Sequence, residues 1–216
     1  MSPTFAETLR SATMPAHDTA NHSPFISALL GGELSVDAFA ELASQLFFVY
    51  SALEETADAM RADPVAGKFV FDELTRGPAL RTDMRFYFGP EWESTITPLP
   101  ATEAYCARIR SAGREWSGGF VAHHYTRYLG DIAGGQAIRV KLKNLHNVTG
   151  PGSLFYCFDQ VPSAPRFRDN YRELLNTAPW DAQERKRMIL ESVRAYELNV
   201  GIFTALAEKM PAYLVN

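Results

Sequence analysis

Apolar residues recur at steps of three and four along most of this chain, and this spacing most limits how it can fold. The pattern is clearest over residues 35–60, where Ser35 is a plausible N-cap. Alternating apolar and polar residues, which mark half-buried strands, are scarce. The sequence therefore predicts an all-α fold. Further helices are expected near residues 78–88, 101–112, 118–146, 166–176 and 181–208.

The chain has 216 residues, enough for one sizeable domain or two small ones. No internal repeat, low-complexity tract or shift in composition marks a boundary, so a single domain of about seven or eight helices over residues 1–216 is predicted. Residues 89–100 and 147–165 are expected to be loops, with a short extended piece at "LFYCF" (154–158). Thr177 or Asp181 is expected to cap the last helix.

Charge and hydropathy exclude several classes of protein. The net charge of −4 does not suggest nucleic-acid binding. The first twenty residues hold charged side chains and no continuous apolar run, unlike a secretory signal, and no stretch approaches a membrane span. Cys106 and Cys157 lie far apart and form no metal or redox motif, so both are interpreted as buried thiols. A cytoplasmic protein without a membrane partner is expected.

The stretch "RYLGDIAGGQ" (127–136) places three glycines in a predicted helix, where each costs about 1 kcal/mol relative to alanine. Gly130 and Gly134 lie four apart and share a face. Either another helix crosses closely there, or a flat ligand lies on the bare backbone. Asp131 needs a partner if it is buried. Arg127, one turn earlier, could pair with it, or Asp131 could be a site carboxylate in a water network.

The histidine pattern does not predict a metal centre built from side chains alone. His17 and His22 are five apart, about 140° around a regular helix, and cannot chelate one ion. No Glu-x-x-His pair of the di-iron type occurs, and the acidic pair at 54–55 is interpreted as a solvated helix edge. A single histidine can still be an axial heme ligand. His123 and His124 are expected to serve packing and hydrogen bonding.

Several segments together resemble one known family. "AHHYTRYLGDIAGGQ" (122–136) strongly resembles the signature of the heme oxygenases, and "FVYSALEE" (48–55) matches another block of that family. "HDTANHSPF" (17–25) lies where the family carries its proximal histidine, while "YRELLN" (171–176) and "LNVGIF" (198–203) fit its C-terminal helices. The resemblance covers nearly the whole chain in the expected order. It implies one all-helical domain with heme between a proximal helix and a kinked, glycine-rich distal helix.

The resemblance also implies roles for individual residues around the iron. His17 would be the axial ligand, and Gly130 and Gly134 would let the distal backbone approach the heme face. The family's distal hydrogen-bond network is matched by Tyr50, Arg127, Asp131 and Asn199.

Heme carries two propionates, and the family's propionate-side positions are matched by Arg10, Tyr125, Arg168 and Arg172. Arg166 is a further candidate. Arg168 and Arg172 are four apart on one predicted helix and share a face, and Arg10 lies two helical turns before His17. Arginine suits bidentate recognition of carboxylates.

Two departures from the family's pattern concern the proximal side. Several relatives carry a glutamate four residues after the proximal histidine, whereas this chain has Asn21. An amide can accept the imidazole N–H bond but carries no charge, so it should make the imidazole a weaker donor to iron. Pro15 precedes His17 by two residues, so the first helix is expected to be kinked there or to begin anew. Either outcome weakens the argument from helical phase for Arg10.

The implied reaction is the cleavage of heme b, both substrate and cofactor, to biliverdin, CO and Fe²⁺ with O₂ and external electrons. A ferric hydroperoxide attacks a meso carbon, the α edge in most of the family. Asp131 would hold a water that passes a proton to the terminal oxygen, and the glycines would confine the oxygen sterically. The implied partner is an electron donor protein, either an NADPH-linked reductase or a ferredoxin. The protein itself is expected to be a monomer. Iron acquisition and pigment supply are both compatible purposes.

Two other functions stay open at this point. A heme carrier or sensor would keep His17 and the arginines but has no use for Asp131 among glycines. A thiamine-degrading type of enzyme on a related helical fold would need a nucleophilic cysteine among carboxylates. Cys106 and Cys157 lack such surroundings in the sequence.

Overall fold

The computed structural model of the chain describes residues 2–215 and confirms the all-α prediction. Over that range the only β pairing is one isolated bridge between Leu34 and Leu214. If the single-turn α5 is set aside and the continuous run α7–η3–α8 is counted once, the described residues form eight helices. The α-helices are α1 (Phe5–Asn21), α2 (Pro24–Gly31), α3 (Val36–Met60), α4 (Gly77–Phe88), α5 (Trp92–Thr95), α6 (Pro100–Glu115), α7 (Ser117–His124), α8 (Gly130–His146), α9 (Ala164–Thr177) and α10 (Ala182–Glu208).

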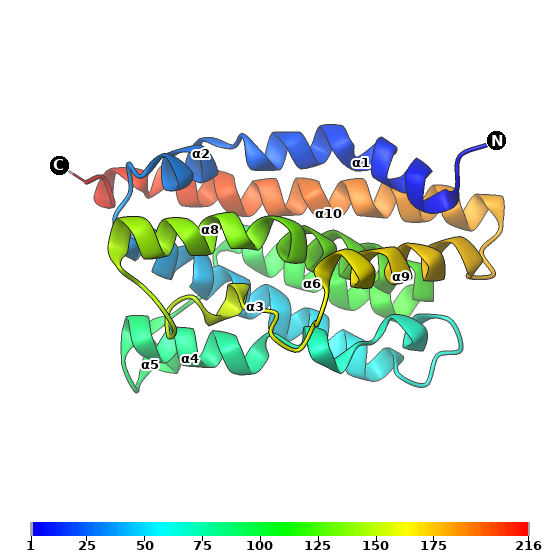
Figure 1. Cartoon of the computed structure of the whole chain (residues 1–216), viewed down its shortest axis with the longest axis horizontal. Helices are drawn as coiled ribbons and strands as arrows, with labels where there is room; N and C mark the ends of the chain where they lie inside the picture. Colours follow the sequence, from blue (N-terminus) through cyan, green and yellow to red (C-terminus); the bar gives the residue numbers. More distant parts are fainter. Residues whose placement is uncertain (1, 216) are drawn as a thin grey trace.

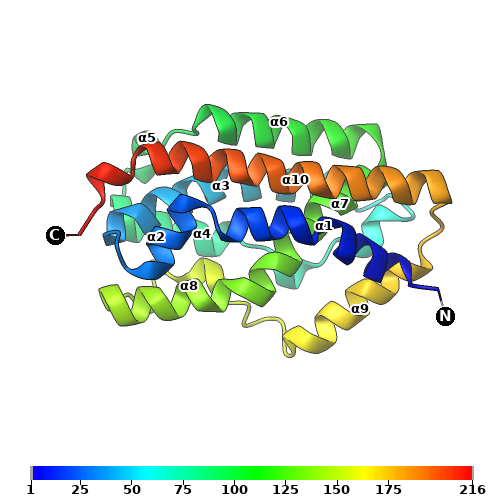
Figure 2. The same cartoon turned by 90° about the horizontal axis from the view of Figure 1, so that it is seen from above.

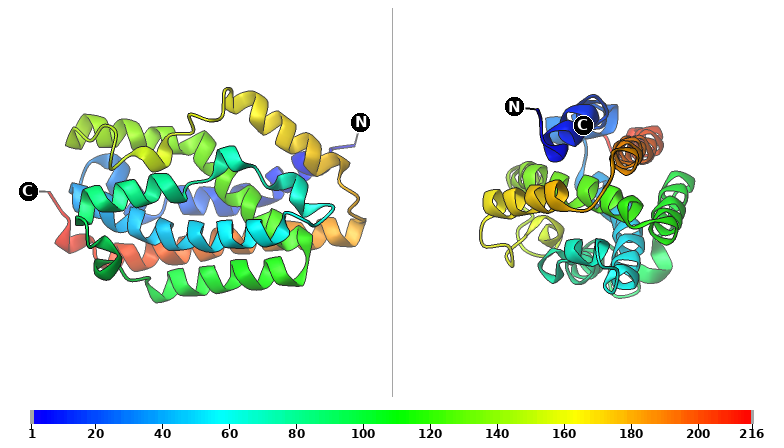
Figure 3. Two further views of the ribbon diagram at one scale, coloured as in Figure 1. Left: turned by 90° about the horizontal axis from the view of Figure 1, so that it is seen from below. Right: turned by 90° about the vertical axis from the view of Figure 1, so that its right-hand side faces the viewer.

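The helices pack around one large apolar core (Figure 3). α3 packs against α4 and α6, and α10 packs against α1, α6 and α7 (Figure 1). Seen from above, α1 runs between α10 on one side and α8 and α9 on the other (Figure 2). By length and composition α3 alone among the described helices could span a membrane, but 67% of that window is buried inside the fold. Its apolar character is therefore explained by its central position.

α1 passes through Pro15 without a new start, so the alternative of a helix beginning at Pro15 is wrong. The helix starts ten residues earlier, at Phe5, after a capping box in which the Thr4 side chain accepts from the Glu7 backbone and Glu7 binds the Thr4 backbone. Pro15 lies on the exposed face. The backbone hydrogen bond that proline removes there leaves a carbonyl that water can reach. The helix is therefore continuous from Arg10 to His17, so the argument that these two residues lie on nearly the same face of α1 applies.

The glycine-rich helix contains the predicted irregularity, at Tyr125–Leu129 (η3), a π-helical turn joining α7 to α8. A π-turn inserts an extra residue and bends the helix locally, and such turns are frequent at functional sites. Gly130 itself has ordinary helical angles, with φ −63° and ψ −50°. The backbone change therefore lies just before the glycines.

The expected extended piece at 154–158 is wrong, because Leu154–Tyr156 forms a 3-10 turn (η4). The Asp83 carboxylate on α4 accepts the backbone N–H groups of Gly152 at 2.7 Å, Leu154 at 3.1 Å and Phe155 at 2.8 Å. Three donors converging on one carboxylate require a curled backbone. No local sequence pattern signals this partner, which is about seventy residues away in the chain.

One connection differs from the prediction, and one predicted cap is confirmed. The expected loop at 89–100 contains the helical turn α5, whose Trp92 is buried against Phe47, with ring centroids 4.9 Å apart. Of the two expected caps for the last helix, Asp181 is the actual one and accepts from the Glu184 backbone at 2.8 Å. Thr177 ends α9.

A buried ionic network joins α6, α7 and α10. Glu191 accepts from Arg108 Nη2 at 2.6 Å and lies 2.9 Å from His123 Nε2. His124 Nδ1 lies 2.9 Å from the Tyr171 hydroxyl. Both histidines thus have the packing and hydrogen-bonding roles expected of them. Burial raises the pKa of Glu191, but hydrogen bonds from Arg108 and His123 outweigh it and hold the pKa at about 2.

We expect Glu191→Gln to lower the free energy of unfolding by about 3 kcal/mol at pH 7. Because the folded pKa is depressed to about 2, the stabilisation is fully present above the ordinary carboxyl pKa. This stabilisation is lost as the pH falls towards the pKa of Glu191 in the folded protein. Urea unfolding at pH 7 and pH 3 should show a smaller difference between variant and wild type at pH 3. Glu55→Gln, in an exposed pair with Arg110, is the control and should change stability much less. Equal effects of the two variants would contradict the prediction.

Candidate active site

A cavity of about 510 Å³ lies between α1 and the distal helix and is lined also by residues of α9 and α10. Its volume is within the range usual for small-molecule sites. The predicted site residues that line it are Arg10, His17, Tyr125, Arg127, Gly130, Asp131, Gly134, Arg168, Arg172 and Asn199. Tyr50 lies behind this lining and reaches it through Asp131. Arg166 is exposed and does not line the cavity, so the structure does not bring it to the site.

His17 lies on the α1 wall, with its side chain 36% exposed. Its ring packs edge-on against Tyr196, with centroids 5.9 Å apart. Asn21 Nδ2 lies 3.1 Å from Nε2, and Asp18 Oδ1 lies 3.2 Å from Nδ1. The sequence pointed only to Asn21 beside this ring, and the structure adds the carboxylate of Asp18. A carboxylate at the far nitrogen of a ligating histidine raises its basicity.

The distal glycines divide into two kinds by their surroundings. A Cβ added to Gly130 or Gly134 would meet no atom within 4 Å, because both border the cavity. A Cβ on Gly135 would lie 3.0 Å from Tyr156 Cδ1. The close-packing explanation therefore applies to Gly135 and not to the other two. Gly130 and Gly134 leave a bare stretch of helix open to a ligand.

The four predicted distal residues meet in one network. Arg127 donates from Nη1 to Asn199 Oδ1 at 2.8 Å and from Nη2 to Asp131 Oδ2 at 3.2 Å. The Tyr50 hydroxyl donates to the same Asp131 oxygen. The ion pair with Arg127 is confirmed, while the site-carboxylate interpretation stays a prediction, with the Asp131 side chain 19% exposed and lining the cavity.

The electrostatics of this network keep its donors protonated. Burial raises the pKa of Tyr50 well above its ordinary value, and the Asp131 charge raises it further. Burial lowers the pKa of Arg127, but Asp131, Tyr50 and Tyr105 together outweigh this and raise the pKa overall. Tyr50 and Arg127 therefore act as fixed hydrogen-bond donors to Asp131.

A cluster of cationic side chains forms another wall of the cavity. Arg10 comes from α1, Arg168 and Arg172 from α9, and Tyr125 from the distal helix. All three groups line the cavity, and burial raises the pKa of Tyr125 while the charges of Arg172 and Arg10 lower it. Arg168 Nε is buried without a partner among the described residues. Such an orphaned donor fits an anionic group of a ligand.

Two side chains that do not line the cavity but interact with residues of the distal helix were not predicted. Tyr105 has a buried hydroxyl without a partner in the described part of the chain, and the Arg127 charge acts on its pKa, which burial raises overall. Glu54 is not the solvated residue expected. It accepts from the backbone N–H of Gly77 at 3.2 Å and from the Tyr128 hydroxyl at 3.4 Å. Its position four residues after Tyr50 could have indicated this, because both then face the distal helix.

The residues present fit heme. A bare helix face and an imidazole line the same cavity, so a flat ring can lie between them, and the arginine cluster suits its carboxylates. Among residues 2–215, no group of three or more His, Cys, Asp or Glu side chains could hold a metal ion. A porphyrin iron needs only one axial protein ligand, which the cavity offers in His17.

Comparisons with known proteins agree with this geometry. A family model described as heme oxygenase matches residues 3–205. A heme oxygenase of Porphyra purpurea is 34% identical over 95% of this chain and 88% of the relative, and heme oxygenase 1 of Synechocystis is 32% identical over 95% and 86%. The crystal structure of heme oxygenase-1 from Synechocystis in complex with heme has a TM-score of 0.92 and 31% identity, covering 97% of this chain and 95% of that one. The heme oxygenase structure from Leptospira interrogans has a TM-score of 0.89 and 31% identity, covering 94% and 100%.

Proposed function

Because this chain belongs to the heme oxygenase family and degrades heme, we propose that it converts heme to biliverdin IXα, CO and Fe²⁺ with O₂ and electrons from an external reductase. One observation carries the proposal. His17, the bare glycine face and the Asp131 network border the same cavity. A heme carrier would use the first two features but not the third.

The proximal and propionate residues bind and orient the substrate. Bound heme supplies the oxygen chemistry of its own cleavage, and the protein steers it. The His17 imidazole would hold the iron through Nε2, in place of its present contact with Asn21 Nδ2, while the Asp18 carboxylate at Nδ1 would orient the ring. The carboxylates would be held by Arg10, Tyr125, Arg168 and Arg172. Charged fork-shaped donors at one end of the cavity fix the in-plane rotation of the ring, and with it the meso edge exposed to reaction.

The distal helix limits what can happen above the ring. Gly130 and Gly134 present backbone only, so no side chain at these positions can act as a strong acid or base. The backbone at these glycines also forms a wall of the cavity. We infer that this wall favours the α-meso edge.

Asp131 would deliver the proton through water. Both donors from the protein, Tyr50 and Arg127, bind its Oδ2 atom, and residues 2–215 provide no hydrogen bond to Oδ1. The free oxygen is therefore available to accept from a water in the cavity. Because the carboxylate is held from behind, the water it binds has a fixed position. This arrangement moves a proton without placing the acid itself against the iron.

The alternative based on a cysteine nucleophile finds no support in the structure. Burial raises the pKa of the Cys106 thiol to about 11 and also raises that of Cys157. Both side chains are buried, and neither lines the cavity. A nucleophilic cysteine needs a lowered pKa and access to substrate.

Adding heme to the purified protein tests the enzyme against the carrier. We expect a Soret band that titrates to one heme per chain. With ascorbate or a reductase and O₂, this band should decay as the biliverdin absorption appears. A Soret band that stays unchanged under turnover conditions would indicate a carrier and contradict the proposal. Chromatography of the product against the four isomers checks the α regiochemistry.

We further propose that the protein is a cytoplasmic monomer, a single domain over residues 1–216, which receives electrons from a ferredoxin or an NADPH-linked reductase. The support is the family, whose model matches residues 3–205. Sedimentation of the heme complex checks the oligomeric state.

A further inference from the structure

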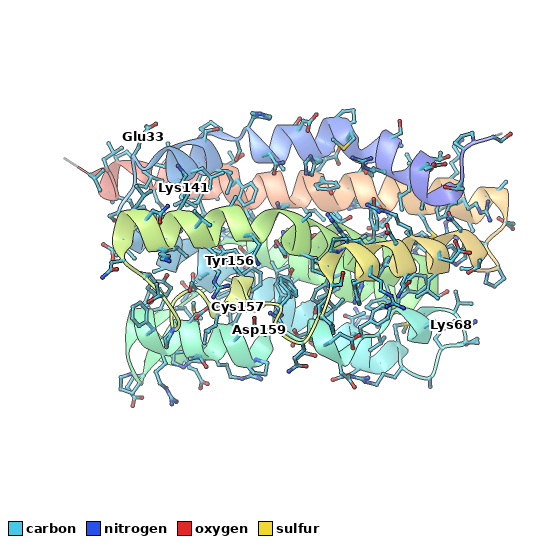
Figure 4. The ribbon with its side chains drawn as sticks, in the orientation of Figure 1. Glu33, Lys68, Lys141, Tyr156, Cys157 and Asp159 are labelled. Carbon is cyan, nitrogen blue, oxygen red and sulfur yellow. The ribbon has the colours of Figure 1, made fainter. Side chains whose placement is uncertain are left out.

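Tyr156 is a cavity residue that the site described above does not use. It lies on the η4 turn between α8 and α9, directly below α8 in Figure 4. The residue is 5% exposed and lines the cavity. Its ring contacts Gly135, and its backbone carbonyl accepts from Gln136 Nε2 at 2.8 Å. The side chain is thus held against the same helix that carries Asp131.

The loop that carries Tyr156 is fixed by buried groups on α4 and just before it. Asp83 binds three of its backbone N–H groups, and the Tyr87 hydroxyl donates to Gly152 O at 2.6 Å. Arg76 donates to the carbonyl groups of Phe155 and Cys157. A phenol on a loop anchored in this way has a defined position.

The hydroxyl of Tyr156 is free and stays protonated. It makes no hydrogen bond to any residue that the structure describes, although a buried phenol normally has a partner. Burial raises its pKa well above the ordinary value, and the charges of Asp131, Tyr87 and Asp83 raise it further. Asp131 is the first of these charges, so the phenol and this carboxylate are electrostatic neighbours.

Asp131 is also incompletely satisfied, as its Oδ1 atom accepts no hydrogen bond from the described residues. A free donor and a free acceptor therefore border one cavity. Water between them would bond to both groups, and its position would be set from two directions instead of one.

We propose that Tyr156 is a further distal residue of this site, whose hydroxyl donates a hydrogen bond into the cavity and orders the water held by Asp131. This inference rests on the proposed role of Asp131 and extends it. It assigns Tyr156 a positioning role, because it acts on the water and not on the heme ring.

The acid–alkaline transition of the ferric heme complex tests the proposal, because it reports hydrogen bonding above the iron without turnover. Tyr156→Phe keeps the ring against Gly135 and removes only the hydroxyl. Loss of a donor disfavours the alkaline form, so the midpoint should rise by about half to one pH unit, the effect of one hydrogen bond. An unchanged midpoint would overturn the proposal.

Tyr87→Phe is the matched control, because it removes another buried hydroxyl from the same loop without touching the cavity. We expect its midpoint to match the wild type. Equal shifts in both variants would mean that loop displacement is responsible, and the Tyr156 proposal would fail. Heme binding and biliverdin formation by the wild type are measured separately. A wild type that binds heme but forms no biliverdin would overturn the proposed function. The effect of Tyr156→Phe on the acid–alkaline midpoint could still be interpreted, because that measurement needs no turnover.

Discussion

Asp131→Ala should bind heme normally and form biliverdin at least about a hundredfold more slowly, the usual contribution of a positioned proton-transfer group. The reason is geometric. The carboxylate lines the cavity while Tyr50 and Arg127 hold it through one oxygen. Without the Asp131 carboxylate, a water above the heme ring has no acceptor that fixes its position. Proton delivery then depends on water molecules that are not held in place. Heme titration followed by single-turnover formation of biliverdin measures the two steps separately.

Asp131→Asn provides the control for packing. It keeps the shape of the side chain and one acceptor for Tyr50 and Arg127 but removes the charge. The alanine variant leaves both donors without that acceptor, at a cost to folding of about 1–3 kcal/mol, so thermal unfolding of each heme complex should be compared. If both variants form biliverdin at the wild-type rate, Asp131 does not deliver the proton.

His17→Ala should abolish the histidine-ligated heme spectrum. Loss of an outer partner of a metal ligand typically costs 10–100-fold in affinity or activity, so loss of the ligand itself should reduce turnover by at least about a hundredfold. Added imidazole should restore the histidine-type spectrum, since the truncated side chain leaves room on the cavity wall.

His22→Ala is the matched control, because His22 is exposed, binds the Asp18 carbonyl and does not line the cavity. Its heme spectrum should be that of the wild type. A histidine-ligated spectrum that persists in His17→Ala but disappears in His22→Ala would move the axial ligand to His22.

The surroundings of His17 also change what we expect of its imidazole as an electron donor to iron. The replacement of a glutamate by Asn21 suggested a weaker imidazole donor. The structure places the Asp18 carboxylate at Nδ1, at 3.2 Å, so a negative charge is present after all from a neighbouring position. Asp18 is 57% exposed, so solvent screens it and its effect is smaller than that of a buried carboxylate.

Local sequence determined the helices and the residue types of the site. The three-and-four spacing predicted α3, α4, α6, the α7–α8 run, α9 and α10, because amphipathic periodicity is a property of the chain alone, but it did not single out α1. Gly130, Gly134 and Asp131 could be singled out for the same reason, since their cost inside a helix is also local. Arg127 could be paired with Asp131 from helical spacing, but the grouping with Tyr50 and Asn199 depended on the family resemblance, because these two residues lie far from the motif in the sequence.

Only the tertiary structure decided what surrounds each candidate site residue. Gly135 packs against Tyr156 while Gly130 and Gly134 face the cavity, a division that the motif itself does not contain. Glu54 and Asp83 bind backbone N–H groups of distant segments, so the predicted extended piece was wrong and the predicted solvated edge holds only for the exposed Glu55. The physical reason is the same in each case. Helical periodicity is encoded within a few residues, whereas the partner of a buried carboxylate, phenol or bare backbone is set by how whole helices pack.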